Sequence, residues 1–388
     1  MAAESTWQLG RGTGPLRGVR VVEIAGIGPG PHACMILADL GADVIRIDRP
    51  GGGIFSGGAA ELLNRGRPSV ALHLKHPDAV ATVLDLVAGA DVLVEGLRPG
   101  TMERLGLGPE ECLERNPALV YGRMTGWGQS GPLATTAGHD LGYVAVTGAL
   151  HDLGQDPARP HFPGNLLGDF GGGSTYLVIG VLAALLEARV SGVGQVVDAA
   201  IVDGTAHLNA MGAMLRATGM GGRGRAQGLL DGGAPFYDLY ETSDGRHLAV
   251  GALEPQFYAE LLEGLGLTGQ VPDRNDPTTY AELRAILAAR IAERTLAEWD
   301  EVFDGSDACV APVLTLEEAA THPHLAARGT FAEVDGLLQP SPAPRFSRTE
   351  AALTTPPDLP GAHTREALLA WGVEGVDALL ASGAAVQA

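Results

Sequence analysis

The sequence has very little lysine and an excess of acidic residues. Lys75 is the one lysine among 26 basic residues, and 46 acidic residues give the 388-residue chain a formal net charge of −20 at pH 7. Nucleic acids and anionic membranes bind surfaces with spread basic charge, so this balance argues against both as partners. A local basic pocket for a small anion stays compatible with it. A genome that favours arginine explains the composition, but a position that keeps lysine hints at a need for a compact ammonium.

Cysteines and targeting patterns are equally scarce. The three cysteines are far apart and form no CxxC pair, which indicates neither a disulfide framework nor a metal site: Cys34, Cys112 and Cys309. Residues 1–18 lack a basic-then-apolar signal pattern, and the longest apolar run, residues 177–186, is too short to span a bilayer. The last residues, 386–388, are no obvious peroxisomal address. We therefore expect a soluble cytoplasmic protein.

What the chain does contain is an alternation of strand and helix patterns. Hydrophobic residues make up 45% of it, enough for a packed core. An apolar strand at 19–24 leads through a glycine-rich loop to a helical pattern at 32–40 and a second strand at 43–48. This order is typical of a βαβ unit in a parallel sheet. Similar strand and helix patterns follow at 69–72, 77–90, 92–95, 102–105, 109–115, 119–124, 176–190, 196–200 and 202–217.

The composition changes at 218–235, where glycine is dense. Two strands around a Ser243-Asp244-Gly245 turn and three helical stretches then predict a smaller α+β domain. We predict that residues 1–225 form the first part of a large Rossmann-like α/β domain with a parallel sheet. Residues 226–330 form the small domain, and 331–388 return through a proline-rich linker to a final helix that completes the large domain.

The loop from Gly26 to Pro31 invites a dinucleotide-binding interpretation, with Asp48 as the ribose acid. The third glycine of that motif is missing, because Pro31 stands in its place. Pro29 and Pro31 also remove amide donors that a pyrophosphate would use. The sequence therefore disfavours nicotinamide chemistry, although the loop can still approach an extended ligand.

Two potential proton carriers stand beside glycines. His139 lies in Gly138-His139-Asp140, and Asp169 precedes Phe170 and three glycines. Imidazole and carboxylate groups often move protons near neutral pH. Facing one another across a pocket, they could remove a proton from one face of a carbon and return one to the other. The alternative is structural: His139 as a satisfied loop histidine and Asp169 as a helix cap.

Several blocks of unusual residues occur in order along nearly the whole chain, from about residue 16 to 365. They are LRGVRVVE at 16–23, ADLGADVIRIDRP at 38–50, EGLRPG at 95–100, GRMTGWGQ at 122–129 and PAPRFS at 342–347. Together they resemble the class III CoA-transferase family. This resemblance implies an interlocked homodimer, a Rossmann-like large domain with a small domain, and CoA as part of the substrate rather than a separate cofactor.

Within the family, Gly138-His139-Asp140 resembles the α-methylacyl-CoA racemase branch. Transferase members usually carry another residue at the His139 position and use the aspartate at the Asp169 position as a nucleophile that forms acyl anhydrides. The racemase resemblance extends to residues 164–173, 195–200 and 251–258.

The resemblance also implies the roles of three residues in removing hydrogen beside a thioester. His139 and Asp169 would serve as the two bases, and the thioester carbonyl would hold the charge as an enolate. Glu254 matches a glutamate expected to pair with the histidine and fix its tautomer. Alternatively, Glu254-Pro255 simply begins a helix. Asp169 precedes a helical pattern, and the N-terminus of a helix favours a negative charge. The glycines that follow it would let backbone amides approach the thioester oxygen.

A further set of positions resembles the CoA contacts of the family: Arg49, Leu72, Lys75, Gly96, Leu97, Arg98, Arg104, Gly138, Asp140 and Tyr143. Arginine can fork onto phosphate oxygens or stack on adenine, and lysine supplies a compact charge. Any single arginine of the set could instead be a solvated surface charge. Met124, Met211, Met214 and Met220 form either a soft floor for varied acyl chains or ordinary core.

The sequence thus predicts a racemase that interconverts (2R)- and (2S)-2-methylacyl-CoA thioesters by 1,1-proton transfer through an enolate, with no cofactor and no metal. The alternative within the family is a CoA-transferase that moves CoA between carboxylic acids with Asp169 as nucleophile. A third interpretation is a non-catalytic acyl-CoA-binding protein. The presence of both His139 and Asp169 argues against it, because binding alone needs neither.

Overall fold

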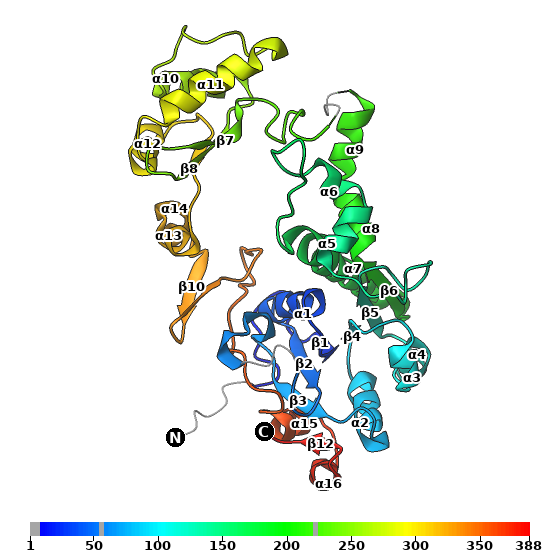
Figure 1. Ribbon diagram of the computed structural model, residues 1–388. Coiled ribbons are helices and arrows are strands. Elements are labelled where there is room, and N and C mark those ends of the chain that lie inside the picture. Colours follow the sequence, from blue (N-terminus) through cyan, green and yellow to red (C-terminus); the bar gives the residue numbers. More distant parts are fainter. Residues whose placement is uncertain (1–7, 54–57, 220–223) are drawn as a thin grey trace. The chain divides into compact units, whose positions relative to one another are not determined.

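The structure, a computed structural model, describes residues 8–53, 58–219 and 224–388. It contains two compact units (Figure 1). The larger unit combines Met1–Thr147, Gly164–Leu208 and Ala327–Ala388, and the smaller one combines Gly148–Pro163 and Asn209–Ala326. Both units therefore draw on more than one stretch of the chain. The predicted boundaries after residues 225 and 330 stay a prediction.

A seven-stranded sheet forms the centre of the larger unit, in the order β12-β3-β2-β1-β4-β5-β6. All neighbours are parallel except β12, which pairs antiparallel with β3. The predicted parallel sheet is thus confirmed. Its strands are β1 (Arg20–Ile24), β2 (Asp43–Asp48), β3 (Ser69–Leu72), β4 (Val92–Glu95), β5 (Val120–Thr125), β6 (Gln195–Ala200) and β12 (Ala385–Val386).

The strand order reverses beside β1. The chain builds β2 and β3 on one side of β1 and then β4, β5 and β6 on the other. In open parallel sheets, ligands bind at the carboxyl ends of the strands beside such a switch point. The carboxyl ends of β1 and β4 are therefore the expected place for a site.

The helices of the larger unit cover both faces of this sheet. Pro29, Pro77 and Pro109 each stand at the start of a helix, where the missing amide is not needed and the fixed φ suits the first turn. The helices are α1 (Pro29–Asp39), α2 (Pro77–Ala88), α3 (Thr101–Arg104), α4 (Pro109–Arg115), α5 (Asp140–Val146), η3 (Leu166–Ser174), α7 (Thr175–Ser191), α8 (Ile201–Leu208), α15 (Thr364–Ala370) and α16 (Val376–Ser382), with two short turns at η1 (Gly58–Ala60) and η2 (Leu62–Asn64).

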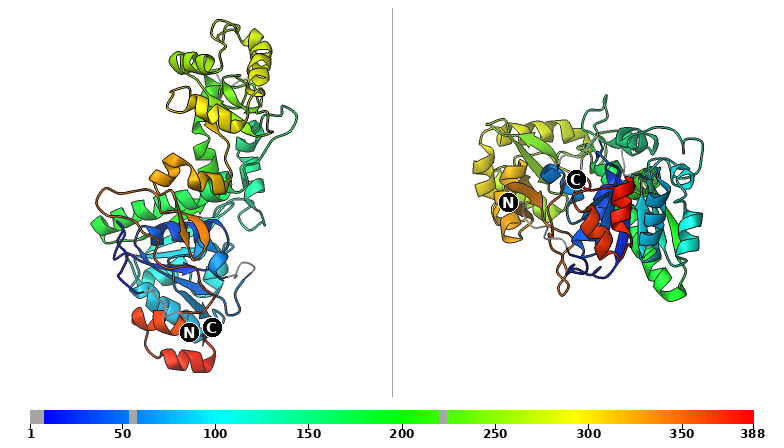
Figure 2. Two further views of the ribbon diagram at one scale, coloured as in Figure 1. Left: turned by 90° about the vertical axis from the view of Figure 1, so that its left-hand side faces the viewer. Right: turned by 90° about the horizontal axis from the view of Figure 1, so that it is seen from below.

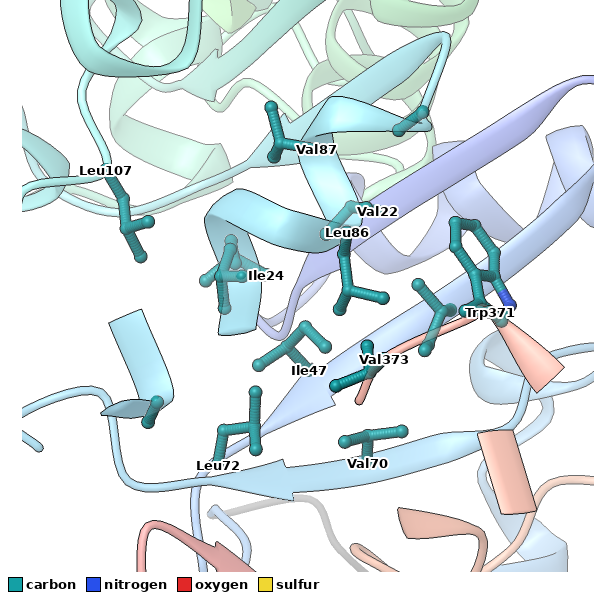
Figure 3. Packing of buried hydrophobic residues seen from close by; sticks show 14 of the residues in the cluster. Val22, Ile24, Ile47, Val70, Leu72, Leu86, Val87, Leu107, Trp371 and Val373 are labelled. Atoms are coloured by element: carbon teal, nitrogen blue, oxygen red, sulfur yellow. The ribbon is translucent and has the colours of Figure 1, made fainter. Parts of the chain in front are cut away.

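Alternate residues of the strands enter two separate cores. On one face Val22, Ile47 and Leu72 pack with Leu86 of α2 and Trp371 of the C-terminal segment (Figure 3). On the opposite face, strand side chains pack against helices α1 and α7. The strands contribute Val21, Val44, Val92, Val94 and Val120, α1 contributes Cys34 and Leu37, and α7 contributes Leu177 and Val181. Burying each large side chain contributes about 1.5–3 kcal/mol. The C-terminal helix α15 packs beside β3 and α16 beside β12, as the labels in Figure 1 show. Both helices are drawn in red near the C-terminus in Figure 2.

Helices η3 and α7 form one continuous helical stretch, Leu166–Ser191, which by length and composition is apolar enough to cross a membrane. It is longer than the apolar run at 177–186 suggested, because the glycines at 171–173 remain helical. Leu177, Val178 and Val181 are buried in the core beside β5 and β6. Burial against the sheet accounts for the hydrophobicity of this face of the stretch, whereas Ile179, Leu186 and Val190 on α7 are exposed.

The smaller unit contains a three-stranded antiparallel sheet, β7-β8-β9, over a core that includes Leu261, Leu287 and Trp299. Its elements are α6 (Ala149–Asp152), α9 (Ala210–Ala217), β7 (Tyr237–Glu241), β8 (His247–Gly251), α10 (Pro255–Gly264), η4 (Pro277–Thr279), α11 (Tyr280–Ile291), α12 (Leu296–Phe303), β9 (Val310–Pro312) and α13 (Leu316–Thr321). Helix α14 (Pro323–Ala327) ends at the boundary between the units.

Two local predictions need correction. The single helix expected at 202–217 is interrupted at Asn209, so α8 and α9 are separate helices in different units. Asparagine side chains compete for backbone hydrogen bonds and disfavour helix interiors. The linker also contains an unpredicted hairpin of β10 (Phe331–Val334) and β11 (Leu337–Pro340). It turns at Asp335 and Gly336, which both have positive φ.

A buried ion pair fastens this hairpin to the rest of the larger unit. The guanidinium of Arg65 forks onto Asp39 of α1 at 2.6 and 3.1 Å. Arg65 Nη1 also donates to Gln339 Oε1 and to the Pro340 carbonyl oxygen, both at 2.9 Å. Burial raises the pKa of Asp39, and Arg65 opposes that rise. Three segments far apart in the chain thus share one guanidinium.

Replacing Arg65 with methionine should lower the free energy of unfolding by about 3–5 kcal/mol, because it leaves the Asp39 carboxylate buried and unpaired. Urea denaturation measures this loss. The matched control is Arg115→Met, which breaks an exposed pair with Asp85 at 2.8 Å and should cost less than about 1 kcal/mol. Equal losses in the two variants would contradict this account of the Arg65 pair.

Candidate active site

A cavity of about 440 Å³ lies at the carboxyl ends of β1, β4 and β5 in the larger unit. Its walls include the loop 26–31, the segment 95–99, residues 124–127, 134 and 136–139, Tyr143, Asp169 and Ile201. The position agrees with the reversal of strand order beside β1. Its size is that of a small-ligand site.

The two predicted proton carriers both line this cavity. His139 is the N-cap residue of α5, with an extended backbone and an exposed side chain. Asp169 belongs to η3, a π-helical segment that continues directly into α7. Asn165, rather than Asp169, is the N-cap residue of that segment, so the helix-cap interpretation of Asp169 is wrong. Two separate elements therefore bring the imidazole and the carboxylate to one cavity.

The carboxylate of Asp169 lies in a polar but partly desolvated setting. Its Oδ2 is 3.4 Å from the point that a Cβ on Gly28 would occupy. Burial raises the pKa of Asp169 to about 6, and the nearby Asp140 carboxylate adds to the rise. A hydrogen bond from the Asn165 side chain and the charge of His139 act in the opposite direction. A carboxyl group with this pKa can both accept and return a proton near neutral pH.

Asp140 links the two proton carriers. It follows His139 in the chain, and its Oδ1 accepts a hydrogen bond of 2.7 Å from the backbone amide of Asp169. A Cβ on Gly168 would lie only 2.3 Å from the same oxygen, so the contact depends on glycine at that position. The sequence suggested Asp140 as a CoA contact; its carboxylate holds the backbone of Asp169.

Tyr143 forms a wall of the cavity. Its ring lies edge-on to Trp127, with centroids 4.8 Å apart. A Cβ on Gly126 or Gly138 would come within 1.9 or 2.5 Å of this ring. Glycine at both positions is therefore needed for the tyrosine to sit here.

Five of the predicted CoA-contact residues line the cavity: Gly96, Leu97, Arg98, Gly138 and Tyr143. Arg49 and Lys75 lie outside it, but Arg49 directly follows β2 and Lys75 comes three residues after the end of β3, so both stand at the same edge of the sheet. Arg104 is exposed on α3 and contacts Thr101. The Leu72 side chain is fully buried in the core, which leaves only its main chain for a ligand. The binding roles of all these residues stay predictions.

Glu254 belongs to the smaller unit, where it is the exposed N-cap residue of α10. Its side chain makes no capping hydrogen bond. The pairing of Glu254 with His139 stays a prediction. Of the methionines, Met124 lines the cavity, Met211 and Met214 are exposed on α9, and Met220 lies outside the described residues.

The sequence did not single out two residues that support the site. Asn165 hydrogen-bonds to the Asp169 carboxylate, and His32 contacts the π-helical segment that carries Asp169. No motif marked either residue, because both act through neighbours that only the fold brings close. The sequence did indicate the place of Gly28 at the site, because the glycine-rich loop 26–31 was expected to approach a ligand closely.

The glycines at 171–173 pack against α8 rather than standing free. The nearest atoms to a Cβ on Gly172 belong to Thr205, at 2.4 Å, and a Cβ on Gly204 would lie 1.9 Å from the Gly172 carbonyl oxygen. Gly172 and Gly173 are buried. The glycine run therefore lets two helices approach closely and fixes the course of η3 past the cavity.

An α/β fold whose switch-point cavity holds an imidazole and a carboxylate with a raised pKa defines an enzyme of the acid–base class. Comparison of the chain with known protein families narrows this class. The model of CoA-transferase family III matches residues 16–364, so the chain belongs to that family.

Two similar relatives are α-methylacyl-CoA racemases. The mouse racemase is 46% identical over 360 residues, 92% of this chain and 93% of its own. The human racemase is 43% identical over the same shares of the two chains. Among solved structures, a CaiB/BaiF family protein from Brucella suis superposes with a TM-score of 0.79 at 27% identity, covering 92% of this chain and 99% of that one.

Replacing Asp140 with asparagine should lower the pKa of Asp169 from about 6 toward the ordinary range, because it removes a neighbouring negative charge and keeps an acceptor for the Asp169 amide. Carbon-13 NMR titration of the Asp169 carboxyl carbon measures this change. Asp203→Asn, at an exposed carboxylate on α8, is the control and should leave the titration unchanged. An unaltered midpoint in the Asp140 variant would overturn the assigned coupling.

Proposed function

We propose that the protein is a racemase that interconverts (2R)- and (2S)-2-methylacyl-CoA thioesters by 1,1-proton transfer. The observation that carries this proposal is that His139 and Asp169 line one cavity from two different elements. Two proton carriers are needed when a proton leaves one face of a carbon and another arrives at the opposite face. The similarity to the mouse and human α-methylacyl-CoA racemases supports the same conclusion.

In this mechanism one carrier removes the α-proton while the thioester carbonyl takes up the charge as an enolate. The second carrier then protonates the opposite face. With a pKa raised to about 6, Asp169 is mostly ionised at pH 7 to 8 and is a stronger base than an ordinary aspartate. His139 serves the other face, and Glu254 pairs with its imidazole and stabilises the cation.

The CoA portion of the substrate binds along the basic edge of the sheet. Arg49, Lys75 and Arg98 follow the parallel strands β2, β3 and β4, so all three stand where the carboxyl ends of the strands meet. Within the part of the chain that the structure describes, neither Lys75 nor Arg98 forms an ion pair with a carboxylate. Unpaired cations are available to the phosphates. Arg104 extends the same edge, and Asp140 and Leu72 shape the binding region through main-chain positions.

The protein works as a homodimer in the cytoplasm and needs no cofactor beyond the CoA of its substrate. Exposed apolar side chains along α7 support self-association, because contiguous apolar surface marks interaction sites. Ile179, Leu186 and Val190 are 55%, 66% and 87% exposed.

The test is incubation of one epimer of a 2-methylacyl-CoA in D₂O, with the α-position followed by NMR. We expect racemisation together with α-deuterium incorporation. Transfer of CoA to an added free acid without exchange would replace the proposal with a CoA-transferase. Binding with neither reaction would support a non-catalytic acyl-CoA-binding protein.

His139→Ala should abolish racemisation and leave CoA binding intact, because the cations of the basic edge are untouched. Binding is measured by isothermal titration with CoA itself. Loss of CoA affinity in a folded His139 variant would instead make this residue part of the binding surface.

The basic edge makes a separate prediction. Lys75→Gln and Arg98→Gln should each raise KM for the acyl-CoA by roughly 10-fold with kcat little changed, as expected for the loss of one charge-assisted contact. Steady-state kinetics measures both constants. Arg189→Gln, at an exposed arginine in the last turn of α7, is the matched control. A fall in kcat at constant KM would place Lys75 or Arg98 in the chemical step.

A further inference from the structure

His32 contacts the segment that carries Asp169, although it does not line the cavity. It stands in the first turns of α1, and its amide donates to the Gly28 carbonyl oxygen at 3.1 Å. Its ring stacks on Phe170, with centroids 4.2 Å apart and an interplanar angle of 24°. Its Nδ1 is 2.6 Å from Ser174 Oγ. The imidazole therefore touches η3 on both sides of the glycine run.

The hydrogen bonds around Ser174 favour one tautomer of His32. Ser174 Oγ donates its proton to the Phe170 carbonyl oxygen, at 3.0 Å. A hydroxyl group has one proton, so a Ser174 that donates to Phe170 takes the proton of the 2.6 Å contact from Nδ1 of His32, whereas the other tautomer would turn the Ser174 proton toward Nδ1. Burial, together with the charges of Arg65 and Arg67, lowers the pKa of His32 to about 4. The ring is therefore neutral at physiological pH, and it is a fixed donor rather than a proton carrier.

The segment that His32 holds has an unusual geometry. In η3 the Phe170 amide donates to the Asn165 carbonyl oxygen at 3.2 Å, and the Thr175 amide donates to the Phe170 carbonyl oxygen. These five-residue spacings are those of a π-helix, which is rarely stable over more than one turn and is frequent at functional sites. Three consecutive glycines add little helix propensity of their own. Contacts from outside the segment must therefore maintain it.

The geometry matters for Asp169 because Asp169 stands just before these glycines. If the π turn relaxed to α-helical spacing, the residues before it would rotate about the helix axis by roughly 100° per residue of changed register. The carboxylate would then leave its place beside Gly28. The start of α1 thus lies beside η3 at two places. The N-cap residue Gly28 stands near the Asp169 carboxylate, and His32 contacts Phe170 and Ser174.

We propose that His32 is a positioning residue that maintains the π-helical turn from Phe170 to Ser174 and so directs the Asp169 carboxylate into the cavity. The proposal rests on the racemase function proposed above. His139 stands at the N-cap of α5, and the hydrogen bond and ring contact of His32 go to Ser174 and Phe170 of η3. A displaced η3 should therefore slow proton exchange at the face of the substrate that Asp169 serves and leave exchange at the other face unchanged.

The test compares both epimers of a 2-methylacyl-CoA in D₂O and records the initial rate of α-proton exchange for each. In His32→Phe the ring is kept and the donor is lost. Exchange of the epimer that Asp169 deprotonates should fall on the order of 100-fold, as for a misplaced catalytic group. Exchange of the epimer that His139 deprotonates, and KM for both, should stay at wild-type values.

Three further variants make the result decisive. His32→Asn keeps an N–H donor near the Nδ1 position and should recover part of the lost exchange. Ser174→Ala removes the same hydrogen bond from the other partner, and should reproduce the epimer-specific loss even where His32→Phe folds poorly. His363→Phe is the matched control, because His363 Nδ1 also takes part in a hydrogen bond, from the Ser69 amide at 3.4 Å, beside β3 rather than beside η3. It should leave both exchange rates unchanged.

Failure of this proposal and failure of the proposed function give different results. If Asp169→Asn and His139→Ala do not each silence one epimer, the racemase mechanism itself fails. If they do, but His32→Phe slows both epimers equally or slows neither, the positioning role is overturned. Nitrogen-15 NMR gives an independent check, in which a ring protonated at Nε2 at pH 7 would contradict the assigned tautomer.

Discussion

The close approach of η3 and α8 is the constraint on which the site depends. Gly172 and Gly204 meet with so little space that a single Cβ on either would strike the other helix or its side chains. This contact fixes where η3 passes the carboxyl ends of β1 and β4. The carboxylate of Asp169, its partial burial and its raised pKa all follow from that course. The glycine run thus acts through helix packing, and this packing sets the position and the pKa of the Asp169 carboxylate.

The sequence predicted the features that depend on local patterns. Apolar runs and periodic helices indicated the parallel sheet and the glycine-rich loop that lines the cavity. Ordered blocks of residues indicated CoA-transferase family III, which the match over residues 16–364 confirms. His139 and Asp169, 30 positions apart in the chain, were identified as a pair from their residue types and glycine neighbours, and both line one cavity.

What the sequence did not predict depends on contacts between distant segments. Strands β9 and β12 are short and gain their identity from pairing with β8 and β3. The π-helical spacing of η3 has no marker in the local sequence, and His32 meets this segment only because α1 packs beside η3. The Asp335-Gly336 pair is typical of a hairpin turn, but the segment after residue 330 was predicted as an extended linker because it is rich in proline. Asn209 ended a helix that hydrophobic periodicity alone would have continued.

Asp140 has a consequence for how variants of the site can be read. It is covalently next to His139, and its side chain accepts a hydrogen bond from the backbone amide of Asp169, so it joins the start of α5 to η3. Removing this acceptor would release the Asp169 backbone from α5 while keeping the side chains of both bases. Position 140 therefore separates the placement of the carboxylate from its presence, two effects that a substitution of Asp169 itself would mix.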